Sequence, residues 1–186
     1  GKQYRLKCIN VEADKDNFEN LQSNTVEYDD LVLNLFGTFS ENIDRILRET
    51  AGSPALFFLD PFGVKGINWD LLQRVIHRGD ITDLWVRFDQ TAVLRLAGRF
   101  GNTGLGAEKS FSILCDTYGV YDPDLLHKQL ASSIPADKKQ KAVNLYKEIL
   151  AKEFRQVRQK GFVAAYPIRS ITEQDKYSLI FATGHP

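Results

Sequence analysis

Hydrophobic residues along the chain follow two spacings, one typical of strands and one typical of helices. Short apolar runs occupy residues 4–12, 31–36, 55–59 and 82–88, and each is bounded by polar or turn-forming residues. Between the runs, apolar residues recur at three- and four-residue steps, as Ile43, Ile46 and Leu47 do. Strands that alternate with helices predict an α/β fold whose mostly parallel sheet is covered by helices on both faces.

Capping residues predict where several helices begin. Thr38 and Glu41 have the T-x-x-E spacing of a capping box, and Asp14 and Asn68 precede further helical stretches. The run at 55–59 is the most hydrophobic segment and lies between chain breakers, which predicts a central strand of the parallel sheet.

The C-terminal half predicts an insertion, a long helix and a hairpin. Periodicity is weak over residues 98–136, which we interpret as an irregular insertion with a short helix near 124–130. A helix over 138–160, capped by Asp137, has one apolar face made of Val143, Tyr146, Leu150, Phe154 and Val157. The strands at 162–168 and 177–183 are close enough to pair antiparallel. We expect one domain over 1–186.

Composition excludes several classes of protein. The 186 residues are 43% hydrophobic, which is typical of a globular chain and excludes a wholly disordered one. No apolar run approaches the length of about 18 residues that a membrane span needs, and Cys8 and Cys115 form no C-x-x-C pair. The three histidines have no metal-ligand spacing, so no metal site is expected. We expect a cytoplasmic protein, and because Met is absent we expect its sequence to begin inside a longer chain.

Charge is balanced overall but unevenly distributed. Residues 135–186 contain 10 Lys and Arg against 5 Asp and Glu. Eight of the basic residues lie on the predicted long helix: Lys138, Lys139, Lys141, Lys147, Lys152, Arg155, Arg158 and Lys160. This helix face is either a solvated surface or a contact for nucleic acid phosphates, and a protein partner is a further expectation.

The glycine-rich segment at residues 101–110 does not match the known phosphate-binding motifs. A P-loop that ends at Lys109 and Ser110 needs glycine at Thr103 and Glu108, and a dinucleotide fingerprint from Gly104 needs glycine at Lys109. We therefore interpret this segment as an ordinary flexible loop. No G-x-S-x-G motif is present, so nothing favours a serine hydrolase.

The strongest candidate for chemistry is Asp60, Pro61 and Phe62, followed by Gly63. An acid at the carboxyl end of a parallel strand lies where open α/β sheets bind ligands. A carboxylate and the carbonyl groups of a proline-restricted turn can accept the two N–H bonds of an exocyclic amine, while the aromatic ring stacks on a planar base. The alternative is that Asp60 only caps the turn and Phe62 packs on the sheet edge.

Glu12 is a second candidate because it ends the first strand. An acid in this position can accept hydrogen bonds from both ribose hydroxyls of an adenosine-containing ligand. A surface glutamate at a strand end is the alternative interpretation.

Taken in order, these features resemble a class I S-adenosylmethionine-dependent methyltransferase. The shared parts are an acid-ended second strand, Asp-Pro-aromatic after the fourth strand, and a terminal antiparallel hairpin. The segments 57–63, 67–69 and 177–186 look like those of the bacterial three-Cys-motif partner proteins. The resemblance implies a Rossmann-like methyltransferase sheet, which in this chain begins at the second strand and lacks the first strand with its glycine-rich cofactor loop.

The resemblance also implies roles for individual residues. Glu12 and the adjacent Ala13 would hold the ribose of S-adenosylmethionine, and Thr38 stands where an acid usually receives the adenine amino group. Asp60 and Pro61 would orient the target amine, and Phe62 would stack on the base. The implied function is methyl transfer to an amino group of a nucleic acid base. The alternative is a non-catalytic methyltransferase-like module that binds nucleic acid or a protein.

Overall fold

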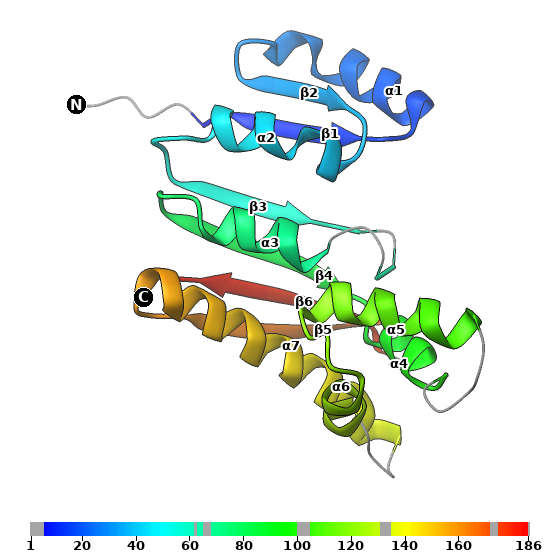
Figure 1. Ribbon diagram of the computed structural model, residues 1–186. Helices are drawn as coiled ribbons and strands as arrows, with labels where there is room; N and C mark the ends of the chain where they lie inside the picture. Colours follow the sequence, from blue (N-terminus) through cyan, green and yellow to red (C-terminus); the bar gives the residue numbers. More distant parts are fainter. Residues whose placement is uncertain are drawn as a thin grey trace. The chain divides into compact units, whose positions relative to one another are not determined.

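The computed structural model describes residues 6–61, 63–64, 68–99, 105–130, 135–171 and 175–185. Contacts within it group into two compact units, an N-terminal unit, Gly1–Ala51, and a C-terminal unit, Gly52–Pro186 (Figure 1). Each unit is described by itself below. The expectation of one domain over 1–186 stays a prediction.

The N-terminal unit is built on two parallel strands. Strand β1 (Cys8–Glu12) pairs with β2 (Val32–Phe36), and Glu12 lies opposite Phe36. Helix α1 (Lys15–Thr25) and the short 3-10 helix η1 (Val26–Tyr28) connect the strands, and helix α2 (Phe39–Glu49) follows β2. The predicted parallel strands are confirmed where the residues are described.

Two predicted helix starts in this unit are also confirmed. The Asp14 side chain caps α1 by accepting a hydrogen bond from the amide of Asn17, at 3.0 Å. Thr38 and Glu41 form the full capping box at the start of α2. The buried residues Leu35, Ile43 and Ile46 form the core between strand and helix.

The C-terminal unit contains a mixed four-stranded sheet in the order β3-β4-β6-β5. Its strands are β3 (Ala55–Leu59), β4 (Thr82–Phe88), β5 (Phe162–Arg169) and β6 (Asp175–Thr183). Strands β3 and β4 run parallel, whereas β4 pairs antiparallel with β6, and β6 with β5. The predicted C-terminal hairpin is confirmed. The chain thus has an α/β fold with one parallel and one mixed sheet.

Among the described residues, five helices accompany this sheet: α3 (Trp69–Ile76), α4 (Gln90–Ala97), α5 (Leu105–Tyr118), α6 (Pro123–Leu130) and α7 (Pro135–Arg158). Figure 1 shows α3 and α7 on the same side of the sheet. Buried residues of β3, β4 and β6 point to this side, among them Phe57, Leu84 and Ile180. Their burial against the helices makes the core of the unit.

Two expectations about β3 need correction. Among the described residues β3 pairs only with β4 and is a border strand of its sheet, not a central one. Leu56 and Phe58 on its second face are each 61% exposed, so the described helices of this unit do not bury both faces. The sequence is misleading here because a strand buried on one face and a strand buried on both can each consist of apolar residues throughout.

The predicted irregular insertion is wrong over much of its length. Helix α5 has 14 residues and begins within the segment interpreted as a flexible loop, at Leu105, while residues 101–104 lie outside the described residues. Its buried face includes Ser110 and Thr117 beside Leu114 and Tyr118, so polar residues mask the apolar period. The expected short helix near 124–130 is confirmed as α6.

The long basic helix is confirmed with changed ends. Helix α7 begins at Pro135, a residue favoured in a first helical turn, so Asp137 lies inside that turn and does not cap it. It ends at Arg158, and Gln159 follows with a φ of 63°. Four residues of the predicted apolar face are buried, namely Val143, Tyr146, Leu150 and Phe154. None of the described helices combines the length and apolar character that crossing a membrane requires.

Candidate active site at the ends of β3 and β4

The carboxyl ends of β3 and β4 meet at one edge of the mixed sheet because these two strands are parallel. Asp60 and Pro61 follow β3, and Asp89 follows β4. The Asp60 side chain is 54% exposed and accepts a hydrogen bond from Nη1 of Arg87, at 2.9 Å. Asp60 therefore lies at an exposed edge and not in the packed interior.

Arg87 holds the Asp60 carboxylate in a defined orientation. Its guanidinium also lies over the ring of Tyr177, 4.5 Å from the ring centroid. The hydrogen bond to Asp60, followed by the negative charges of Asp60 and Asp89, raises the pKa of Arg87 above its ordinary value. Arg87 is thus a permanent cation, and it occupies one carboxylate oxygen of Asp60. Oδ2 of Asp60 has no hydrogen bond from any described residue.

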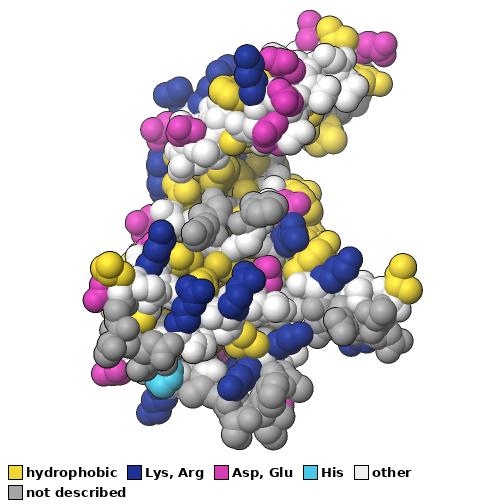
Figure 2. Space-filling view, turned by 90° about the vertical axis from the view of Figure 1, so that its right-hand side faces the viewer, with side chains coloured by type: hydrophobic (Ala, Val, Ile, Leu, Met, Phe, Trp, Pro, Cys, Tyr) yellow, Lys and Arg dark blue, Asp and Glu magenta, His cyan; other side chains and the backbone are white. Residues whose placement is uncertain are grey.

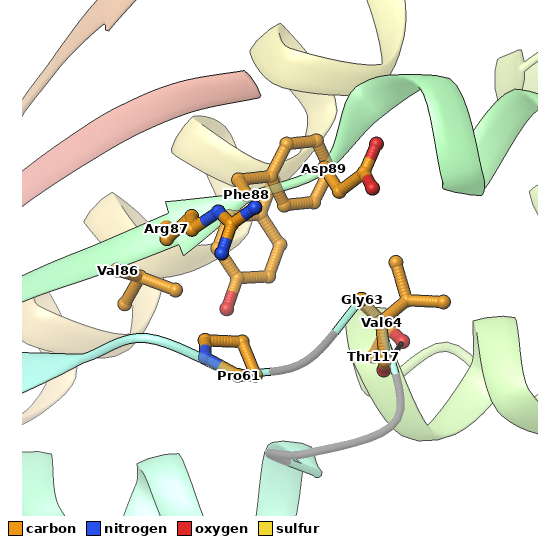
Figure 3. Close-up of a pocket in the computed structure, with 9 residues that line it drawn as sticks. Pro61, Gly63, Val64, Val86, Arg87, Phe88, Asp89 and Thr117 are labelled. Atoms are coloured by element: carbon orange, nitrogen blue, oxygen red, sulfur yellow. Dashed lines mark hydrogen bonds between the residues drawn. The ribbon is translucent and has the colours of Figure 1, made fainter. Parts of the chain in front are cut away.

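A small pocket opens beside this edge. Its volume is about 20 Å³, and its lining residues are Pro61, Gly63, Val64, Val86, Arg87, Phe88, Asp89, Thr117 and Tyr146. Figure 3 shows Pro61 on one side of the pocket, Arg87 and Phe88 on the other, and Val64 and Thr117 at one end. This volume accommodates a water molecule or one edge of a base, because ligand pockets for whole small molecules measure about 300–1,000 Å³.

Most polar side chains around the pocket already have partners. The Asp89 carboxylate caps α4 by accepting a hydrogen bond from the amide of Ala92, at 2.8 Å. The Thr117 hydroxyl donates to the carbonyl oxygens of Ile113 and Val64, at 2.7 and 3.3 Å. The Tyr146 hydroxyl is the exception, since no described residue forms a hydrogen bond with it.

Sequence reasoning found Asp60 and Pro61 but missed Arg87, Asp89, Thr117 and Tyr146. Asp89 follows β4 as Asp60 follows β3, so the same strand-end rule could have found it. Arg87 alternates with buried residues along β4 and gave no signal of its own. Phe62, the predicted stacking residue, lies outside the described residues, and its role stays a prediction.

The predicted cofactor residues lie in the N-terminal unit, at the carboxyl ends of β1 and β2. Oε1 of Glu12 accepts a hydrogen bond from the amide of Asp14, at 2.7 Å, and its other oxygen has no partner among the described residues. Ala13 is exposed beside it. Gly37 has a φ of 114° and donates its amide hydrogen to the carbonyl of Glu12, at 2.9 Å. A half-buried carboxylate with a free oxygen fits a ribose hydroxyl.

Thr38 does not fit the role of adenine acceptor as well. Its hydroxyl donates to Oε2 of Glu41, at 2.7 Å, and accepts from the Glu41 amide, at 3.3 Å. The Thr38 amide donates to the same carboxylate, and these bonds, the backbone one first, lower the pKa of Glu41 below its ordinary value. The Thr38 hydroxyl is thus committed to the start of α2.

The basic face of α7 is only partly available to a ligand. The Arg158 guanidinium donates to the backbone carbonyls of Arg78, Gly79 and Asp80, so this side chain joins α7 to the loop before β4. Lys152 and Arg155 are exposed. On the face of the molecule in Figure 2, Lys and Arg side chains are scattered among apolar and acidic ones. A nucleic acid partner stays a prediction.

Metal-ligating residues do not cluster in the part of the chain that the structure describes. No group of three or more His, Cys, Asp or Glu residues there could hold a metal ion. The buried Glu153 on α7 forms hydrogen bonds with Gln73 of α3 and with His77 directly after α3, at 3.0 and 2.5 Å. These contacts link two helices of the core.

Comparison with known proteins gives similarity to solved structures only. No model of a known protein family matches the chain, and no curated protein matches it. One similar structure is an O-methyltransferase from Bacillus cereus in complex with SAH, with a TM-score of 0.48 and 16% identity over 95% of this chain and 62% of that chain. Another is cofactor-bound Rv0187 from MTB, with a TM-score of 0.44 and 14% identity over 95% of this chain and 61% of that chain.

The chain spans less than two thirds of the length of either structure. At TM-scores below 0.5 these likenesses do not decide what this chain does. The resemblance to the three-Cys-motif partner proteins is not tested by them and stays a prediction.

Proposed function

We propose that the chain belongs to an S-adenosylmethionine-dependent methyltransferase that transfers methyl to an exocyclic amino group of a nucleic acid base. The observation that carries this proposal is the Asp60 carboxylate, which lies exposed at the carboxyl end of a parallel strand, directly before Pro61, with one oxygen unpaired. A carboxylate placed in this way can accept a hydrogen bond from one N–H group of an amine, and the Pro61 carbonyl can accept a hydrogen bond from the other.

The role of these residues is to orient the acceptor. When bound, S-adenosylmethionine supplies an electrophilic methyl group. Asp60 and Pro61 would accept hydrogen bonds from both N–H groups of the amine, which would direct its lone pair to one side for in-line attack. The methyl–sulfur bond would break as the nitrogen–methyl bond forms, and the amine would release one proton to solvent. Proximity and orientation then contribute most of the rate enhancement, and the chain needs no nucleophile of its own. Arg87 serves this role indirectly by fixing the carboxylate of Asp60.

Residues of the N-terminal unit would hold the cofactor. Glu12 would accept the ribose hydroxyls through its unpaired oxygen, and the exposed Ala13 would lie beside the adenosine. Thr38 would contribute less, because its hydroxyl is already bonded to Glu41. The exposed basic residues of α7, Lys152 and Arg155 among them, would contact phosphates.

A second candidate function is a non-catalytic module that binds nucleic acid or a protein. The observation in its favour is the small volume of the pocket that Pro61 and Arg87 line, about 20 Å³, which admits only an edge of a base. The two candidates differ in whether the protein binds S-adenosylmethionine and whether methyl is transferred.

Calorimetric titration with S-adenosylmethionine, followed by transfer of labelled methyl to single-stranded DNA and RNA, tests the proposal. We expect saturable heat and label in nucleic acid. Glu12→Gln should weaken cofactor binding about tenfold through loss of charged hydrogen bonds, whereas Glu27→Gln, on the exposed 3-10 helix of the same unit, should not. Absence of heat together with retained nucleic acid binding would instead favour the non-catalytic module.

A further inference from the structure

The Tyr146 ring is fixed in the core beneath the Asp60 edge. Tyr146 is 2% exposed and belongs to the apolar face of α7. Its ring stacks on Phe88 of β4, with 4.6 Å between centroids, and meets the ring of Tyr118 edge-on at 5.8 Å. Packing on two sides leaves the ring a single orientation, so the position of its hydroxyl group is set by the fold.

The hydroxyl groups of these two neighbouring tyrosines differ in their hydrogen bonding. Tyr118 donates to the carbonyl oxygen of Ala142, at 3.1 Å. Tyr146 forms no hydrogen bond with any described residue. A buried hydroxyl without a partner is unfavourable, and such groups in native proteins are usually satisfied by a water molecule or a ligand.

The pocket is the space that the Tyr146 hydroxyl can reach. The fully enclosed side-chain atoms without a hydrogen-bond partner among the described residues include Oε1 of Gln90 and Nε2 of His185, but the Tyr146 hydroxyl is not among them. It therefore retains contact with open space, and Tyr146 lines the pocket together with Pro61 and Arg87. A volume of about 20 Å³ holds one water molecule or one polar atom at the edge of a larger ligand.

We propose that the Tyr146 hydroxyl donates a hydrogen bond to the acceptor base, at an unprotonated ring nitrogen beside the amino group that Asp60 holds. This inference rests on the proposed function and adds a residue that determines specificity. Asp60 accepts a hydrogen bond and Tyr146 donates one, so together they match a base edge on which an amino group adjoins a ring nitrogen with a free lone pair. Cytosine and adenine have such an edge, and uracil does not.

Burial supports the direction of this hydrogen bond. Desolvation raises the pKa of Tyr146 above its ordinary value, so the hydroxyl keeps its proton at neutral pH and remains a donor. In the absence of the base, one water molecule takes the same bond. Tyr146 is thus a binding residue and takes no proton during transfer.

The test compares Tyr146→Phe with Tyr118→Phe, since each change removes one hydroxyl from the same cluster. Thermal unfolding of the free protein should show Tyr118→Phe lowering the melting temperature by about 3 °C, because a paired hydroxyl is lost, and Tyr146→Phe leaving it unchanged or higher. If Tyr146→Phe lowers the melting temperature as much as Tyr118→Phe does, the hydroxyl has a structural partner and the proposal is wrong.

Binding is measured with cytidine and 3-deazacytidine, in which carbon replaces the ring nitrogen beside the amino group. Cytidine is preferred to adenosine because the proposed cofactor itself contains adenosine. We expect wild-type protein to bind cytidine about tenfold more tightly than 3-deazacytidine, and Tyr146→Phe to bind the two equally. Equal discrimination by wild type and Tyr146→Phe, or no binding of cytidine by wild type, would overturn the inference.

Methyl transfer in the same samples separates this inference from the proposed function. If Tyr146→Phe transfers methyl to nucleic acid with an unchanged KM, the proposed function is supported and the proposed role of Tyr146 is contradicted. If cytidine binding depends on Tyr146 but no methyl is transferred, the binding site is supported and the enzymatic activity is contradicted. Transfer with a KM about tenfold higher in Tyr146→Phe supports both.

Discussion

Gln90, at the start of α4, shows how single buried polar groups affect this protein. The residue is 2% exposed, and its side-chain oxygen has no partner among the described residues. Thr82 on β4 is equally buried, but its hydroxyl donates to the carbonyl of Asp80, at 3.0 Å. We therefore expect removal of their polar atoms to change the free energy of unfolding in opposite directions, because an unpaired buried polar group is destabilising and a paired one is not.

Gln90→Met should raise the free energy of unfolding by about 1 kcal/mol, since it removes an unsatisfied amide oxygen and keeps the volume. Thr82→Val should lower it by about 1 kcal/mol because it breaks a hydrogen bond within the core. Urea denaturation of both variants measures these changes. A loss of stability in Gln90→Met as large as that in Thr82→Val would show that the Gln90 amide is bonded in the native protein.

Glu41 gives a prediction about pH at the start of α2. Hydrogen bonds from Thr38 favour the ionised carboxylate and lower its pKa below the ordinary 4.5. Because the folded pKa is the lower one, the stabilisation is complete above pH 4.5 and is lost as the pH falls through the folded value. NMR titration should show that Thr38→Ala, which keeps the amide but loses the hydroxyl, raises the Glu41 pKa part of the way to 4.5. An unchanged pKa in this variant would contradict the role of the hydroxyl.

Among the elements, the end of α5 depends on one glycine. Gly119 has a φ of 65°, and a Cβ atom there would clash with Cδ1 of Trp69, the first residue of α3. Gly52 also has a positive φ, 75°, but nothing lies within 4 Å of its Cβ position. Comparing substitutions at Gly52 and Gly119 therefore separates the loss of stability due to the backbone conformation from the loss due to the contact between α3 and α5.

Gly52→Ala should destabilise the protein by about 1 kcal/mol, which is the cost of a left-handed conformation for a residue with Cβ. Gly119→Ala should cost about 3 kcal/mol, because Trp69 must move as well. Equilibrium unfolding measures both. Equal losses for the two variants would show that α3 and α5 do not approach each other as closely as the structure has them.

Elements with a clear period were predictable from the sequence, and those with a mixed face were not. The capping box at Thr38 and the apolar stripe of α7 follow from local spacing, and both are present. Helix α5 was missed because Ser110, Cys115 and Thr117 occupy its buried face. Asp60 was found because a strand end is a local signal. Arg87 of β4 and Tyr146 of α7 line the pocket beside that strand end, and only the tertiary structure brings these two elements together.

At the scale of the whole molecule, the two cysteines report on different units. Cys8 at the start of β1 is exposed, and Cys115 on α5 is buried. Burial, with a contribution from Asp116, raises the pKa of Cys115 to about 11, so almost no thiolate forms at neutral pH. The reaction rate of each thiol with a reagent therefore shows how accessible to solvent its own unit is.

With a thiol reagent at pH 8, Cys8 should react within minutes and Cys115 only when the C-terminal unit opens. Mass spectrometry of quenched samples follows both sites. Addition of urea below the unfolding midpoint should accelerate labelling of Cys115 much more than that of Cys8. Rapid labelling of Cys115 without denaturant would mean that the core around α5 is open in the native protein.

The central claim is that Asp60 orients the acceptor amine, and single-turnover methyl transfer by Asp60→Ala tests it most directly. Asp83 of β4, half-buried on the same sheet, gives the matched variant Asp83→Ala. We predict that Asp60→Ala abolishes transfer to nucleic acid while its affinity for S-adenosylmethionine, measured by calorimetry, stays within a few-fold of wild type, and that Asp83→Ala retains transfer. Unchanged turnover in Asp60→Ala would contradict the account.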